Sequence, residues 1–136
     1  MEPQVTNNQP VQSEVKINHF YIAKLNDSQA CLSFAVDKGT IVNSYTFEFR
    51  LGILRRNVTG NLTLKLDMGD DNYFAILPLE GDQIRLNDGW LGTEYLVQNT
   101  IADVRPNQTG HYFAHVLLDE VEIAKAETTL FIVEAN

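Results

Sequence analysis

Two histidines near the C-terminal end, His111 and His115, are the first side chains in this sequence that could do chemistry. Imidazole nitrogens bind zinc and copper, and both residues fall on the same face of one predicted strand, with Phe113 between them. Four residues of strand span roughly 13 Å, however, which is too far for both rings to reach one ion. We therefore expect surface or interface histidines here.

A cluster of carboxylates offers a second kind of chemistry. Asp67, Asp70 and Asp71 fall within five residues, and calcium prefers several oxygen ligands from one short loop. They are the candidate metal ligands of the chain. Their spacing does not repeat the alternate positions of an EF-hand loop, so a solvated hairpin loop is the competing interpretation.

Three aromatic residues, Trp90, Tyr95 and Tyr73, could together form a flat platform on which a sugar ring stacks. They are the candidate ligand-binding residues, and they support a carbohydrate-binding module as an alternative function. Aromatic side chains in an all-β protein also fill cores. An exposed Trp90 favours the platform, and a buried one favours the core.

The sequence lacks the motifs of common enzymes. It contains no Gly-x-Ser-x-Gly elbow, phosphate-binding loop, His-Glu-x-x-His pair or glycine-rich nucleotide fingerprint. Its four serines have no recognisable catalytic partner. We therefore expect a protein that is not an enzyme and that needs no cofactor.

The elements that must position these side chains are strands. Apolar residues alternate with polar ones from Ser44 to Arg56, turn residues recur at nearly regular spacing, and no apolar stripe has helical period. An isolated glycine in that strand, Gly52, indicates a bulge or a close backbone approach. The predicted fold is an antiparallel β-sandwich of about seven to nine strands. The strands are expected over residues 14–25, 30–36, 44–56, 62–66, 73–77, 83–86, 90–104, 110–118 and 121–133.

The last two predicted strands reverse at Asp119-Glu120. The first of them opens with Gly110-His111-Tyr112, which resembles the Gly-x-Tyr corner of immunoglobulin-like and fibronectin type III-like sandwiches. The resemblance implies that Gly110 and Tyr112 form a structural corner, in which the tyrosine hydroxyl bonds to the loop backbone. Ala114 stands where disulfide-bonded members have a cysteine. The chain therefore looks like a disulfide-free member, as found in bacterial and phage domains of unknown function.

Charge and composition exclude several partners. The net charge is −8 with one cysteine, so phosphate backbones are repelled and an internal disulfide is impossible. We expect no nucleic acid partner. No signal peptide is recognisable in the sequence, and no apolar run reaches membrane-spanning length, so we expect a soluble cytoplasmic protein. Residues 1–13 read as a disordered polar tail before a single domain over 14–136.

These features favour a non-catalytic protein-binding or structural module. A protein partner is expected, and exposed edge strands would also make a homodimer plausible.

Overall fold

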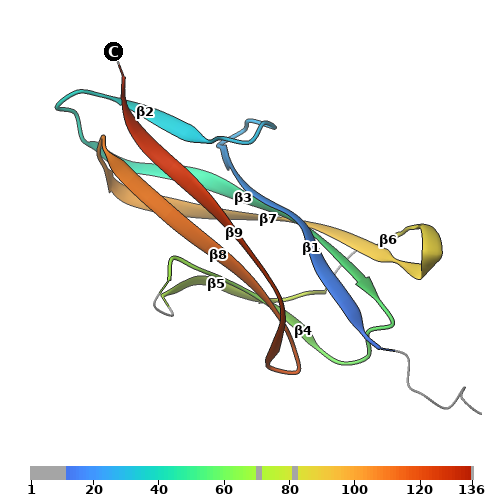
Figure 1. The fold of residues 1–136 in the computed structure, drawn as a ribbon. Coiled ribbons are helices and arrows are strands. Elements are labelled where there is room, and N and C mark those ends of the chain that lie inside the picture. Colours follow the sequence, from blue (N-terminus) through green and yellow to red (C-terminus); the bar gives the residue numbers. More distant parts are fainter. Residues whose placement is uncertain (1–11, 70–71, 81–82, 136) are drawn as a thin grey trace, which may run out of the picture.

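The computed structural model describes residues 12–69, 72–80 and 83–135, which form two β-sheets packed face to face (Figure 1). One sheet has the strand order β1-β3-β7-β6 and the other β2-β9-β8-β4-β5. The all-β sandwich predicted from the sequence is confirmed. The strands are β1 (Glu14–Lys24), β2 (Ser33–Asp37), β3 (Val42–Arg56), β4 (Leu62–Asp67), β5 (Tyr73–Pro78), β6 (Ile84–Arg85), β7 (Leu91–Val104), β8 (Gln108–Leu118) and β9 (Val121–Ala135).

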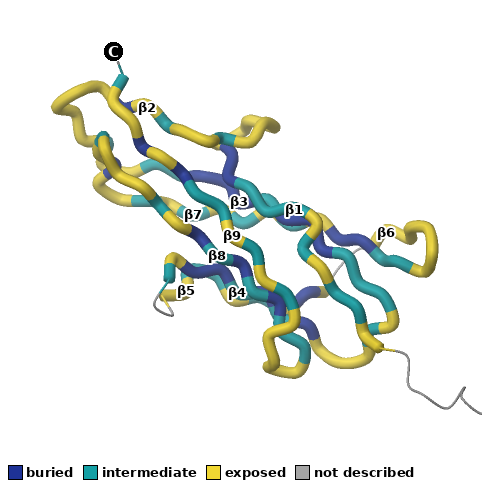
Figure 2. Tube along the Cα trace, in the orientation of Figure 1, coloured by how far each residue is buried: buried dark blue, intermediate teal, exposed yellow. Residues whose placement is uncertain are grey.

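The core lies between the sheets and follows the alternation seen in the sequence. In β3 the buried apolar residues occupy every second position, and β4 supplies a matching row from the other sheet (Figure 2). Burial of such side chains contributes roughly 25 cal/mol per Å² of apolar surface to the driving force for folding. The two rows are Phe47, Phe49, Leu51 and Ile53 in β3, and Leu62, Leu64 and Leu66 in β4.

A bulge in β1 explains why that strand looks apolar on both faces. Its register against β3 shifts between Ile17 and His19. Ile17 packs on the core before the bulge, and Ile22 is buried in the core after it. In a regular strand, two residues five positions apart would point to opposite faces. The bulge turns His19 to the outer face of the sheet, where its ring lies against Gly52. The close approach predicted for this glycine is confirmed.

The hairpin of β8 and β9 reverses at Asp119 and Glu120, as predicted. Both residues have positive φ, 48° and 72°, which is the backbone of a type I′ turn and matches the twist of two antiparallel strands. One pairing departs from the antiparallel prediction, because β2 runs parallel to β9. Leu32, just before β2, is 72% exposed although it falls within the strand predicted over residues 30–36.

Most of the predicted tail, residues 1–13, lies outside the described residues. Of its last two residues, Ser13 donates a hydrogen bond to the carbonyl of Asn57 at 3.0 Å. In the described ranges, no helix has the length and apolar character needed to cross a membrane.

Candidate binding site

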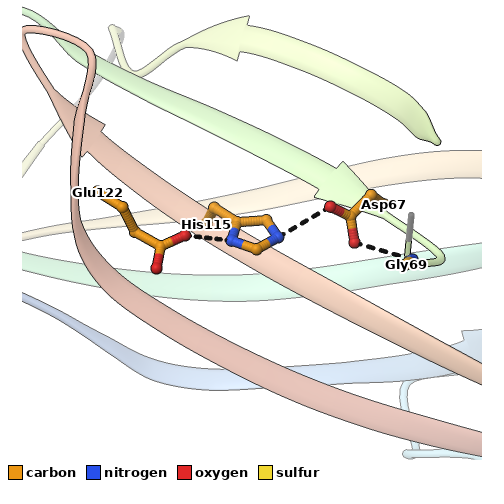
Figure 3. Close-up of polar contacts among 4 residues, drawn as sticks. All are labelled: Asp67, Gly69, His115 and Glu122. Atoms are coloured by element: carbon orange, nitrogen blue, oxygen red, sulfur yellow. Dashed lines mark hydrogen bonds and ion pairs between the residues drawn. The ribbon is translucent and has the colours of Figure 1, made fainter. Parts of the chain in front are cut away.

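The acidic cluster does not present three free carboxylates. Asp67, at the end of β4, is 4% exposed, and both of its oxygens are engaged. Oδ1 accepts a hydrogen bond from the backbone N–H of Gly69 at 3.1 Å, and Oδ2 contacts Nε2 of His115 at 2.9 Å (Figure 3). Asp70 and Asp71 lie outside the described residues. Within the described ranges, no three His, Cys, Asp or Glu side chains converge in a way that could hold a metal ion.

His115 joins three strands on the outer face of the larger sheet. Its Nε2 meets Asp67 of β4, and its Nδ1 meets the carboxylate of Glu122 in β9 (Figure 3). A neutral imidazole carries one N–H, so only the imidazolium can donate both bonds at once. The ring also lies edge-on to Tyr73, with centroids 6.5 Å apart. With both nitrogens occupied, His115 ties strands together. His111, four residues earlier, contacts Thr129 at 3.4 Å.

The three candidate aromatics do not form one platform. Trp90 precedes β7, and its ring is covered by the guanidinium of Arg56, 4.4 Å from the ring centroid. Tyr95, on the inner face of β7, packs against the core and donates a hydrogen bond to the carbonyl of Glu80 at 3.3 Å. Tyr73 belongs to β5 in the other sheet. The sugar-stacking platform that the sequence offered as an alternative is therefore absent from the described residues.

The corner residues pack closely, but without the expected hydrogen bond. The Tyr112 hydroxyl lies 2.7 Å from the position that a β-carbon on Gly110 would occupy. The Tyr112 ring contacts Phe49 and Phe74. In the described part of the chain no group hydrogen-bonds the hydroxyl, and burial raises the pKa of Tyr112. Position 110 requires glycine for space, and Tyr112 acts as a core side chain.

A groove crosses the outer face of the smaller sheet. Two adjoining hollows, of about 340 and 260 Å³, share His19 and Glu94. Gly52 and Gly92 line the second hollow, where the His19 ring and the Leu86 side chain lie against them. Exposed apolar side chains line the rim of the groove. These are Ile84 (56% exposed), Leu86 (45%) and Leu96 (52%).

Arg50 forms the polar wall of this groove. One of its amino groups bonds Oε1 of Glu48 at 2.6 Å and the carbonyl of Asp27 at 2.7 Å. The hydrogen bond from Arg50 is the main cause that lowers the pKa of Glu48, a residue that is 4% exposed. The Nε of Arg50 is buried and has no hydrogen-bond partner in the described chain.

The edge of the sheet next to this groove is open. β7 pairs with β3 along its length, but β6 pairs only with Leu91 and Gly92. From Leu96 to Ala102, no described strand pairs with the other side of β7. An open edge presents a row of backbone N–H and C=O groups that can pair with another strand.

This open segment lacks the features that normally blunt an edge. Its sequence is Leu-Val-Gln-Asn-Thr-Ile-Ala, without charge, proline or glycine, although 21% of the chain is charged. Short uncharged segments of this kind pair readily with other strands. On the outer side, Leu96, Gln98 and Thr100 are exposed, and on the inner side Val97 and Ile101 are only partly covered.

The other edges are protected. β1 carries two lysines and the bulge, β2 has five residues and β6 has two. β5 is short and ends at Pro78, and the start of β9 carries alternating charges. Lysines, proline, bulges and short length are the usual means of preventing edge pairing. The Leu96–Ala102 segment is thus the edge best suited to bind a strand among the described residues.

Comparison with known proteins does not assign this chain to a family. No family model matches the chain, and no curated protein matches it. A solved structure of a Niemann-Pick type C2 protein from Japanese carpenter ant is similar with a TM-score of 0.46 and 10% identity, over 91% of this chain and 97% of that one. The DNA-bound alkylpurine DNA glycosylase AlkC from Pseudomonas fluorescens is similar with a TM-score of 0.31 and 15% identity. That match covers 87% of this chain and 30% of the glycosylase.

Proposed function

We propose that this chain is a non-catalytic module that binds an extended polypeptide strand along the open edge of β7. The observation that carries the proposal is the seven-residue uncharged edge Leu96–Ala102, which has no strand beside it in the described structure. A bound strand gains affinity from main-chain hydrogen bonds, and neighbouring hollows select its side chains. The groove at Arg50 and Leu96 adjoins this edge and is suited to that second role.

The polar side chains support a binding role over catalysis. His115 is held between two carboxylates, and Cys31 donates its thiol hydrogen to the Ser33 carbonyl at 3.0 Å. Burial raises the pKa of that thiol, which makes it a poor nucleophile at neutral pH. A nucleophile activated by a neighbouring base would need the opposite arrangement.

A synthetic peptide with the sequence of residues 93–103 is a direct probe of this edge. We expect it to shift the backbone amide NMR signals of residues 96–102 in a saturable way. In an antiparallel pairing, only alternate residues of the peptide direct their N–H groups toward the protein. Two further peptides, N-methylated on odd or on even positions, are the matched controls.

The expected result is that one N-methylated peptide loses binding and the other retains it. If both bind as the unmodified peptide does, main-chain pairing is not the mode of binding. If none of the three peptides shifts the signals of residues 96–102, the proposed site is refuted.

A further inference from the structure

We infer that the strand bound at this edge is β7 of a second copy of the chain, paired antiparallel about a two-fold axis through Asn99. This inference rests on the proposed function and names the partner. A two-fold axis places identical surfaces against each other, so an edge can pair with itself only if its two halves are complementary. The sequence of this edge meets that condition.

Centring the axis on Asn99 makes the regular segment Leu96–Ala102 pair over its full length. The segment ends naturally at Asp103, whose φ of 53° interrupts the extended backbone. At the opposite end, Glu80 contacts Tyr95, so the chain before β6 bounds the free edge there. Asn99 lies midway between these limits, which fixes the register.

In this register like side chains meet. On the inner side, Val97 faces Ile101 of the second copy, and both are apolar and only partly covered in one copy. On the outer side, Gln98 faces Thr100, and exposed Leu96 faces Ala102. Cross-strand apolar pairs and matched polar pairs each contribute to sheet stability, whereas opposed like charges oppose it. No charged residue is opposed anywhere along the segment.

The second copy would also complete the core at its open side. β1 lies against β9 along one long side of the sandwich. On the other side, Val97 and Ile101 stay half-buried because no strand follows β7. Pairing with a second β7 would cover them with the same residues of the partner and extend the smaller sheet across both copies.

Two double variants at the outward positions 98 and 100 test this register. Because residue 98 of one copy faces residue 100 of the other, Gln98→Lys with Thr100→Lys sets lysines against lysines at both places. Gln98→Lys with Thr100→Glu sets lysine against glutamate at the same places. The second variant is the matched control, since both alter the same two exposed residues.

Sedimentation equilibrium or light scattering over a dilution series provides the readout, with circular dichroism to confirm folding. We expect the wild-type chain to reach twice its 15.4 kDa mass. On dilution, the dimer of the lysine–lysine variant should dissociate at protein concentrations at least tenfold higher than the wild-type dimer does. The lysine–glutamate variant should remain dimeric over the same range as wild type.

A wild-type chain that stays monomeric at the highest soluble concentration would overturn the second copy as partner. If the 93–103 peptide still bound, the open edge would stand as a site for a different strand. A folded lysine–lysine variant that dimerises like wild type, or a lysine–glutamate variant that dissociates with it, would overturn the pairing through Asn99.

Discussion

The imidazole ring of His19 lies over Gly52, so close that a β-carbon at position 52 would come within 2.2 Å of its Cε1 atom. The contact joins the bulge of β1 to β3, and His19 lines both hollows of the groove. Glycine is needed here for space and not for its backbone conformation, because Gly52 does not have positive φ.

Substitution Gly52→Ala should therefore force the His19 ring out of its place. The ring is the far end of a half-exposed side chain and can turn aside. We therefore expect a loss of about 0.5–1.5 kcal/mol in the free energy of unfolding, the usual cost of displacing a side chain from its preferred rotamer. Urea denaturation measures it. The double variant His19→Ala with Gly52→Ala should recover most of the loss, and equal losses with and without the His19 ring would contradict the contact.

Removal of the His115 ring should expose the dependence of Asp67 on its partner. In a His115→Phe variant, buried Asp67 keeps only its bond from Gly69, and leaving a buried acceptor without its partner costs about 1–3 kcal/mol. Glu122→Gln is the control. Its side chain is 47% exposed, so we expect a change below about 1 kcal/mol. If urea denaturation gave equal losses for His115→Phe and Glu122→Gln, the burial of Asp67 would not determine the loss of stability.

The Glu48–Arg50 pair should make stability depend on pH at the acidic end. Since the pKa of Glu48 in the folded chain lies below its ordinary value of 4.5, the unfolded chain takes up the proton first. The contribution is therefore complete above the ordinary pKa and is lost as the pH falls through the folded one. We expect Glu48→Gln to flatten the acidic limb of unfolding free energy against pH. An unchanged limb would contradict the prediction.

Tyr112 should titrate late at the alkaline end. Burial raises the pKa of Tyr112 above its ordinary value of 10.0, so the folded chain resists loss of the proton. Its contribution to stability is constant below about pH 10 and is lost as the pH rises through the folded pKa. Burial also raises the pKa of Tyr95, so ultraviolet absorbance should show late-titrating phenols, one fewer of which remains in Tyr112→Phe.

The same variant tests the corner. Because the Tyr112 hydroxyl makes no hydrogen bond within the described chain, Tyr112→Phe should leave the urea midpoint nearly unchanged. A large loss of stability would contradict this expectation. It would support the hydrogen bond from the tyrosine hydroxyl to the loop backbone that the immunoglobulin-like resemblance implies.

Local patterns in the sequence predicted the strands well. Strict alternation in β3 reports directly which side chains face the core, and the glycine at position 52 indicated its close contact. The bulge at Ile17 and His19 could not be located, because a bulge is a property of two strands in register. In the sequence, the bulge is reflected only in the apolar residues that fall on both faces of β1.

The candidate sites depended on information that no local pattern contains. Trp90 and Tyr73 are separated because their segments join different sheets, and sheet membership is set by long-range pairing. Likewise, Leu96–Ala102 becomes an open edge only because β6 is two residues long. The signal that could have found it is the uncharged run itself, in a chain rich in charge.

The distribution of protected edges bears on how far any assembly could grow. Two copies joined through β7 would bury the uncharged segment of each. The outer strands of the joined sheet would then be the two β1 strands, which carry Lys16, Lys24 and the bulge. Such strands are poor templates for a third chain, so the fold would limit association to a closed pair and resist polymerisation into fibres.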